Sequence, residues 1–388
     1  GRKGGGFHHL AMLRSGPMLI SAALVASSLA SCRAYVSSSA AGGLMGGRSA
    51  LRGLRSGSAE TARPHMLRTG LRMMSDGDFA DWKADTAFLF PGQGAQYVGM
   101  AGQLAQDVPK AKELFDKAAD VLGYDLLKIC VEGPKEKLDS TVYSQPAIYV
   151  SSLAAVERLR QDAGDEAIDK ATVAAGLSLG EYTALCFAGA ISFEDGLKVV
   201  KVRGEAMQAA SEAQESGMVS IIGLDVDVIN QVCEKATELT GSKIQIANYL
   251  CPGNYAVSGG KDACAKVAEI AKPEFKARMT VPLAVAGAFH TDFMQPAVPE
   301  LEKALAEIEI KKPRIPVISN VDASPHSDPD TIKSILTKQV TSPVLWEKTI
   351  KQMMDRGYTE GYELGPGKVV AGIVKRVNKA AAITNIEA

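Results

Sequence analysis

Ser178 has the sequence setting of an activated nucleophile. It lies in GLSLG (176–180), with a glycine two residues away on each side. This spacing is typical of a nucleophile elbow, a tight strand-to-helix turn that needs small residues because its backbone angles are restricted. A serine hydroxyl attacks a carbonyl carbon only when a base removes its proton. The alternative is an ordinary serine in a glycine-rich turn.

Two histidines follow Ser75, and they differ in setting. His326 lies in SPHSDPD, a polar and proline-rich segment that is typical of a solvated loop. His290 lies in VAGAFHTDF, directly after an apolar segment. We therefore expect His290 to be the base for Ser178 and His326 to be an exposed loop residue. The chain order Ser…His is compatible with a hydrolase or a transferase.

Arg203 is a candidate for binding a substrate carboxylate. It lies in KVVKVRGEAM, 25 residues after Ser178 and beside an apolar stripe, from which it could reach into a cleft. A buried guanidinium binds a carboxylate through two charge-assisted hydrogen bonds. A surface arginine at the polar edge of a helix is the alternative reading.

The segments that must position these residues alternate between strand and helix patterns. TAFLFPGQG (86–94) and ATVAAGLSLG (171–180) are apolar strands that stop at glycine turns, and helical patterns follow both. RIPVISNVDA (314–323) returns to the same pattern. We predict an α/β fold with a parallel sheet, similar to that of the α/β-hydrolases, in residues 85–215 and 286–388.

Residues 216–285 have a different order of elements. The patterns read strand, helix, two strands, helix and strand, which is the βαββαβ order of a ferredoxin-like unit. Because this unit lies between the Ser178 turn and the rest of the larger domain, we predict an inserted small subdomain. A cleft between the two parts is the expected substrate site.

The first 75 residues resemble a targeting segment. They contain a short apolar stretch at 18–32 and a long continuation rich in Arg, Ser, Gly and Ala. The stretch is too short for a membrane span, and the continuation resembles a transit peptide. We expect residues 1–75 to be a disordered address for a plastid, including one bounded by extra membranes, and we expect no stable membrane span in the mature protein. A mitochondrial presequence is the main alternative.

The remaining body is acidic. Up to Met74 there are ten basic residues and one acidic residue, which leaves 33 basic and 43 acidic residues from Ser75 onward. A net charge of −10 argues against general binding of nucleic acid. The six cysteines form no Cys-x-x-Cys pair and histidines are few, so the sequence gives little support for a metal site.

Seven motifs in order show a resemblance to a known family. The chain is similar to malonyl-CoA:acyl-carrier-protein transacylases over about residues 85–380. The matching stretches are FPGQGAQ (90–96), GLSLGEY (176–182), RGEAMQ (203–208), NYLCPGNYAVSGG (248–260), AGAFHTDFM (286–294), SNVDA (319–323) and ELGPGKV (363–369).

The resemblance implies a role for each matching residue. Ser178 becomes the nucleophile that carries the malonyl group, and His290 becomes its general base and acid. The backbone carbonyl of Gln339 accepts a hydrogen bond from the other ring nitrogen of His290, in place of an acidic triad member. The backbone N–H groups of Gln93 and Leu179 form the oxyanion hole, consistent with one donor directly after the nucleophile and one on another loop.

Substrate contacts follow from the same resemblance. Arg203 binds the malonyl carboxylate, with Gln93 also at the substrate, and Asn248 and Asn320 line the cleft. Leu177 stands where the family often has histidine, a position to which we assign no proton transfer. The substrates are malonyl-CoA and acyl carrier protein, whose phosphopantetheine arm brings the reacting thiol, and the expected chemistry requires no metal or redox cofactor.

Three other functions remain as alternatives. A serine hydrolase or thioesterase shares the elbow, although it normally has an acidic residue that orients the histidine. A related acyltransferase for polyketide synthesis has the same chemistry with another carrier. A catalytically inactive scaffold is disfavoured because Ser178, His290 and Arg203 are present together. We expect malonyl transfer for fatty acid synthesis.

Overall fold

A five-stranded parallel sheet forms the centre of the larger part of the structure. The computed structural model describes residues 77–388, so the expected targeting segment, residues 1–75, lies outside the described residues. The strands have the spatial order β7-β2-β1-β8-β9, and all neighbours are parallel. The predicted α/β fold is confirmed. The strands are Thr86–Phe90 (β1), Val173–Gly176 (β2), Val317–Ile318 (β7), Glu360–Gly365 (β8) and Ala382–Glu387 (β9).

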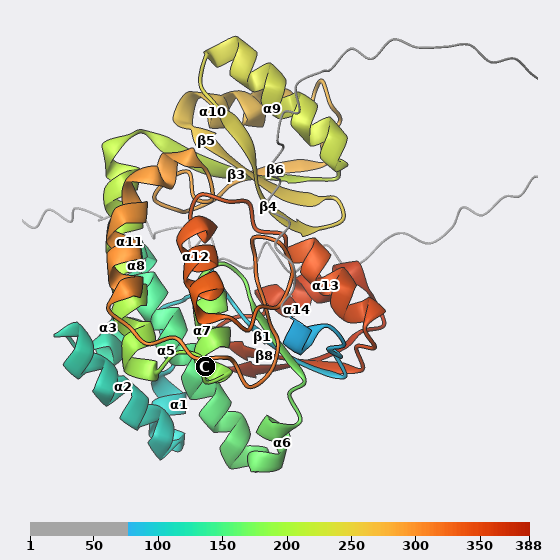
Figure 1. Ribbon diagram of the computed structural model, residues 1–388. Helices are drawn as coiled ribbons and strands as arrows, with labels where there is room; N and C mark the ends of the chain where they lie inside the picture. The colour runs from blue at the N-terminus through green and yellow to red at the C-terminus, as the bar shows by residue number, and fades with distance from the viewer. Residues whose placement is uncertain (1–76) are drawn as a thin grey trace, which may run out of the picture. The chain divides into compact units, whose positions relative to one another are not determined.

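The two faces of this sheet are covered by different helices, as alternating side chains require. Phe88 and Phe90 of β1 lie in one hydrophobic cluster, and Ala87 and Leu89 lie in another. Because both faces are buried at the centre of the sheet, β1 and β2 are runs of mainly apolar residues, buried at every position. The first cluster includes residues of α2 (Pro109–Leu122), α5 (Thr141–Ala163), α7 (Leu179–Phe187) and α8 (Phe193–Ala213), and the second includes residues of α13 (Trp346–Asp355) and α14 (Val369–Val377) (Figure 1).

Helix α5 is buried along most of its length and packs against α2, α8 and β8. Its many small Ser and Ala side chains allow this close packing on several sides. Within residues 77–388, none of the helices combines the length and apolar character needed to cross a bilayer. The other helices are α1 (Gly102–Asp107), α3 (Leu126–Glu132), α4 (Lys135–Asp139), α6 (Asp165–Asp169), α11 (Val298–Ala306) and α12 (Pro329–Gln339), with 3-10 turns at Gly77–Phe79 and Asp292–Ala297.

A second sheet has four antiparallel strands in the order β4-β5-β3-β6. The chain order of strands and helices is βαββαβ, as predicted for a ferredoxin-like unit. Helices α9 and α10 pack on this sheet and share a hydrophobic cluster with it (Figure 1). The elements are β3 (Ser216–Ile222), α9 (Val226–Thr240), β4 (Ile244–Cys251), β5 (Asn254–Gly260), α10 (Lys261–Ile270) and β6 (Met279–Pro282).

Backbone hydrogen bonds join the second sheet to the segment that follows α12. The N–H of Val344 donates to Ala247 O at 2.8 Å, and the N–H of Tyr249 donates to Val344 O at 2.9 Å. This pairing anchors the chain just beyond Gln339, the last residue of α12.

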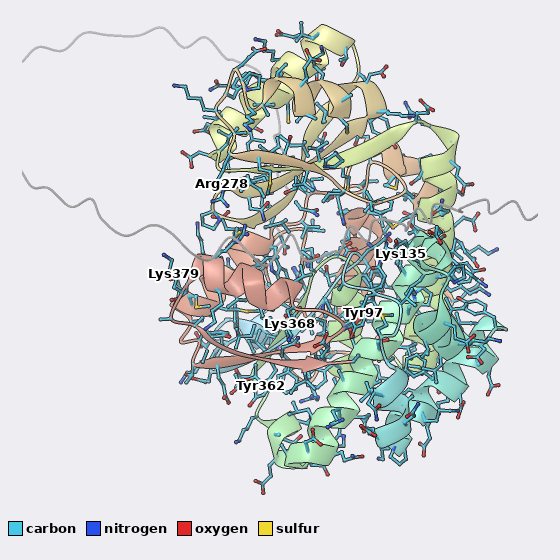
Figure 2. The ribbon with its side chains drawn as sticks, turned by 180° about the vertical axis from the view of Figure 1, so that it is seen from behind. Tyr97, Lys135, Arg278, Tyr362, Lys368 and Lys379 are labelled. Atoms are coloured by element: carbon cyan, nitrogen blue, oxygen red, sulfur yellow. The ribbon has the colours of Figure 1, made fainter. Side chains whose placement is uncertain are left out.

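The loop that follows β1 is joined to the C-terminal strand β9 through Tyr97. The Tyr97 hydroxyl lies 3.3 Å from Glu387 Oε1, and Glu387 also lies 3.6 Å from Lys368 Nζ; Tyr97 and Lys368 are labelled in Figure 2. These contacts connect the loop that contains Gln93 to β9.

Candidate active site

The turn that carries Ser178 is strained and closely packed. Ser178 has φ 52° and ψ −102°, between the end of β2 and the start of α7. A Cβ on Gly176 would lie 1.8 Å from the carbonyl carbon of Gly180, and a Cβ on Gly180 would lie 2.3 Å from Phe90 O. Both positions therefore exclude larger side chains. Ser178 itself is partly exposed.

Asn320 holds this turn from the strand β7 side. Its Oδ1 accepts the backbone N–H of Ser178 at 2.6 Å, and its Nδ2 donates to Gly176 O at 2.8 Å. Asn320 is 1% exposed. Because both polar groups of its side chain bond the turn, the structure favours a positioning role over the substrate contact that the resemblance implies.

His290 lies between Ser178 and Gln339. Its Nε2 is 2.9 Å from Ser178 Oγ, and its Nδ1 is 2.9 Å from the backbone carbonyl oxygen of Gln339. A carbonyl oxygen only accepts hydrogen bonds, so Nδ1 carries the proton and Nε2 presents its lone pair to the serine hydroxyl. The structure therefore brings together Ser178, His290 and the Gln339 carbonyl, the three groups that the resemblance implies.

The imidazole of His290 is neutral at physiological pH. Burial, followed by the nearby positive charge of Arg203, lowers its pKa to about 4, while the hydrogen bond to Gln339 opposes this shift. His290 is 2% exposed. A neutral imidazole can accept the serine proton, so the base is in its active form at pH 7.

Arg203 is a buried guanidinium that points at the nucleophile. Its NH2 group donates to Ser178 Oγ at 3.0 Å and to Gln339 Oε1 at 2.9 Å, and its NH1 group donates to Gln145 Oε1 at 2.7 Å. It is 1% exposed, and burial lowers its pKa. All three acceptors are uncharged oxygens, and none of the ion pairs between residues 77–388 includes this guanidinium. The site therefore has a buried positive charge beside Ser178 that makes no ion pair among residues 77–388, with Glu181 the carboxylate that acts on it from a distance.

Two backbone N–H groups near Ser178 are free to bind an oxyanion. Leu179 is the first residue of α7, so its N–H has no acceptor within the helix. Gln93 follows Gly92, whose added Cβ would lie 2.3 Å from Leu177 O, so this loop packs directly against the nucleophile turn. Among the described residues, no hydrogen bond uses the N–H of Leu179 or of Gln93.

Sequence reasoning missed two residues of this network. Gln145 accepts from Arg203, and Glu181 accepts from Gln339 Nε2 at 2.6 Å. Neither stands out in the sequence: Gln145 follows Ser144 in a polar start to α5, and Glu181 lies in the first turn of α7, where acidic residues are common. Gln339 contributes its side chain as well as its carbonyl, because Nε2 also donates to Ser178 O at 3.0 Å.

Two other residues differ from expectation. His326 is not a solvated loop residue: it is 3% exposed and its Nε2 lies 2.9 Å from Asp322 Oδ2, because the loop folds back and pairs the two side chains. Asn248 lies on β4, and its Oδ1 is buried without a hydrogen-bond partner among the described residues. The described hydrogen bonds do not join Asn248 to Ser178, His290 or Arg203.

Two cavities among residues 77–388 lie away from this site. One, of about 300 Å³, includes Leu114, Leu153 and Phe187 in its lining; the other, of about 360 Å³, lies between α11 and α12. Neither is lined by Ser178, His290 or Arg203. The chemistry available to the site therefore follows from its hydrogen-bond network: a serine with an adjacent neutral histidine, two backbone N–H groups without acceptors and a cation.

Comparison with protein families places this network in a known context. Residues 87–387 match the family model described as "Acyl transferase domain". The chain is 42% identical to the mitochondrial malonyl-CoA-acyl carrier protein transacylase of Homo sapiens over 306 residues, covering 76% of this chain and 78% of the human protein. It is 41% identical to the malonyl CoA-acyl carrier protein transacylase of Bacillus subtilis, covering 76% of this chain and 90% of the bacterial protein.

Solved structures agree with this placement. The malonyl CoA-acyl carrier protein transacylase of Coxiella burnetii superposes with a TM-score of 0.74 at 36% identity, covering 79% of this chain and 94% of that one. A malonyl-transacylase in complex with its type II PKS acyl-carrier protein superposes with a TM-score of 0.73 at 34% identity, covering 78% and 95%. The chain belongs to the malonyl-CoA:acyl carrier protein transacylase family of acyltransferases.

Proposed function

We propose that Ser178 carries the malonyl group during transfer from malonyl-CoA to the phosphopantetheine thiol of acyl carrier protein, for fatty acid synthesis. The observation that carries this assignment is the contact between the buried Arg203 guanidinium and Ser178 Oγ, at 3.0 Å. A cation without a carboxylate partner at this place suits an acyl group that ends in a carboxylate.

The reaction has two symmetrical halves. His290 Nε2 takes the proton of Ser178 as Oγ bonds to the thioester carbon; the C–S bond then breaks, and the CoA sulfur receives the proton. The carrier thiol gives its proton to His290, attacks the malonyl ester, and the C–O bond breaks as Ser178 regains a proton. The N–H groups of Leu179 and Gln93 stabilise the oxyanion of each tetrahedral intermediate, worth about 10²–10³ in rate for one donor.

Arg203 pairs with the malonyl carboxylate in this proposal. Gln145 and Gln339 keep the guanidinium in place, because their side-chain oxygens accept hydrogen bonds from NH1 and NH2. The Gln93 side chain donates to Thr141 Oγ1 at 3.2 Å, which orients the loop whose backbone serves the oxyanion. We assign Asn248 to the substrate on the basis of family resemblance and its unpartnered Oδ1.

The test is incubation with malonyl-CoA alone, followed by mass spectrometry of the intact protein and of its peptides. We expect one malonyl adduct, on Ser178, and transfer of that adduct to an added holo carrier. Ser178→Ala should abolish the adduct, whereas Ser192→Ala, a helix N-cap serine, should keep it. An adduct of full yield in Ser178→Ala would refute the assignment. Release of free malonate in place of transfer would indicate a hydrolase.

A polyketide carrier is the second candidate acceptor, because one structural relative is bound to such a carrier. The chemistry is identical, so only the acceptor distinguishes the two functions. Parallel transfer assays with holo carriers of fatty acid and polyketide systems would separate them: the physiological carrier should have the higher kcat/KM.

We also propose a division of the chain into three parts. Residues 85–215 and 286–388 form the catalytic domain, residues 216–285 form the inserted subdomain, and residues 1–75 form a targeting segment. The family match begins at residue 87, after that segment. We favour a plastid destination, with the mitochondrion as the alternative, since the human relative is named as mitochondrial. A fluorescent fusion of residues 1–75 tests this: a cytosolic signal would refute targeting.

A further inference from the structure

Glu181 is a buried carboxyl group three residues after Ser178, and the reaction described above does not use it. It is 3% exposed and lies in the first turn of α7. Its Oε2 accepts from Gln339 Nε2 at 2.6 Å and from the backbone N–H of Asn320 at 3.1 Å. Neither donor carries a charge, and Arg203 acts on this carboxyl without bonding to it, so its burial is costly. Its presence therefore calls for a role other than stability.

The first contact determines which way the Gln339 carboxamide faces. With Nε2 toward Glu181 Oε2 and Ser178 O, the carbonyl Oε1 faces the donor on Arg203. The flipped carboxamide would place its N–H groups against the guanidinium and its oxygen against two acceptors. The Glu181 carboxyl thus selects the orientation that supports Arg203.

The second contact anchors the residue beneath the nucleophile. The Asn320 backbone donates to Glu181, while its side chain accepts from the N–H of Ser178. Glu181 is therefore hydrogen-bonded directly to both Gln339 and Asn320, the two residues that position Arg203 and the Ser178 turn.

We propose that Glu181 is a positioning residue for malonyl transfer, which orients Gln339 toward Arg203 and holds Asn320 against the Ser178 turn. This inference rests on the proposed function of the same site. Glu181 touches no reacting atom, so its effect must pass through these two residues. Displacing Arg203 affects a malonyl group more than an acetyl group, because only malonyl has a carboxylate to pair with the guanidinium.

The charge state of Glu181 links this role to pH. Burial raises the pKa of Glu181 to about 7. The hydrogen bonds from Gln339 and Asn320 lower this pKa, the charge of Asp322 raises it, and His326 lowers it. The other facing groups are Tyr182 on the same helix and Arg203 on α8. The carboxylate, the form that accepts most strongly, is populated as the pH rises through about 7.

The experiment compares Glu181→Leu with Glu181→Gln. Leucine removes Oε2, the acceptor of both hydrogen bonds. We expect kcat/KM for malonyl-CoA to fall roughly 10²-fold, the effect of a displacement on the order of 1 Å. The loss with acetyl-CoA should be smaller. Glutamine keeps an acceptor oxygen without the charge, so it should restore malonyl transfer to within about tenfold of wild type.

Glu363 supplies the matched control. It is also fully buried, burial raises its pKa to about 7, and it accepts two backbone N–H groups, from Val370 and Ala371 at the start of α14. Glu363→Leu and Glu363→Gln should lower the melting temperature and leave the malonyl-to-acetyl ratio of kcat/KM unchanged.

The pH profile decides the matter even if Glu181→Leu does not fold. In wild type, kcat/KM for malonyl-CoA should rise as the pH increases through about 7. At pH values below this rise, wild type should have about the same kcat/KM as Glu181→Gln. Glu181→Gln itself should show no rise. His326→Gln should keep the rise, which excludes titration of that histidine. An unchanged rise in Glu181→Gln, or equal losses for malonyl-CoA and acetyl-CoA in a folded Glu181→Leu, would overturn the inference. The malonyl adduct on Ser178 in wild type is a separate result, so failure of the proposed function would be recognised independently.

Discussion

Replacing Arg203 with alanine should change the choice of substrate more than the chemistry of acylation. Arg203 is 1% exposed, so the carboxylate that binds it leaves water. Without the guanidinium that carboxylate is buried unpaired, at a cost of about 3–5 kcal/mol. At about 1.4 kcal/mol for each factor of ten, malonyl transfer should fall by roughly two to four orders of magnitude.

Acetyl-CoA has no carboxylate and should escape this penalty. It loses only the hydrogen bond from Arg203 NH2 to Ser178 Oγ. A hydrogen bond from a charged donor is worth about 1.5–3 kcal/mol, or roughly one to two orders of magnitude in rate. Arg203→Lys should recover part of the malonyl activity, because a point charge remains but the planar fork that meets Gln145 and Gln339 is lost.

The assay measures kcat/KM for malonyl-CoA and acetyl-CoA in wild type and both variants, with the melting temperature recorded for each. Arg160→Ala is a suitable control, because Arg160 on α5 pairs with Glu157 and Asp165 and takes no part in the site. If Arg203→Ala lowers kcat/KM for malonyl-CoA and acetyl-CoA by the same factor, Arg203 supports the fold or binds the CoA moiety. The argument from the malonyl carboxylate would then be wrong.

The other predictions concern the base, the turn and the N-terminal segment. His290→Ala should slow acylation by about 10² or more, whereas His326→Ala should leave the acylation rate unchanged and lower the urea midpoint, because it removes the buried contact with Asp322. Because the pKa of His290 is about 4, acylation should be lost as the pH falls through about 4. Between pH 6.5 and about 4, unfolding takes up a proton at His290, so the free energy of unfolding should decrease as the pH is lowered. A free energy of unfolding that stays constant over this range would contradict this. Gly180→Ala should abolish acylation or folding, since its Cβ would lie 2.3 Å from Phe90 O; near-normal kinetics would show that the turn is less constrained. A chain lacking residues 1–75 should keep wild-type kinetics, and lost activity in a folded truncation would show a further role for that segment.

The elements nearest the nucleophile could be predicted from the sequence because their signals are local. β1 and β2 are apolar runs that stop at turns containing glycine, and Ser178 stands at the second stop. The βαββαβ order of the second sheet was readable for the same reason. β7 lies within the predicted segment 314–323 but contributes only Val317–Ile318 to its sheet. β9 has no fully buried face, so its sequence gives no clear pattern by itself.

The supporting residues of the site could not be predicted in this way. Glu181 looks like an ordinary acid in the first turn of a helix, where it would stabilise the helix dipole. Its burial arises from contacts with Gln339 and Asn320, which are 158 and 139 residues away in sequence. His326 was read as exposed from its polar neighbours, but its pairing with Asp322 buries it. Such residues are defined by tertiary contacts that no local pattern contains.

The carbonyl that accepts from His290 Nδ1 has a consequence for the lifetime of the acyl-serine. A histidine oriented by a neutral carbonyl, with a pKa of about 4, is a weak proton acceptor. Water, with a pKa of about 15.7, must lose its proton to a base as it attacks an ester. A thiol, with a pKa of about 8.5, is already partly ionised near neutral pH. A thiol therefore needs less help from this base than water does, and we expect the acyl group on Ser178 to react with a carrier thiol faster than with water.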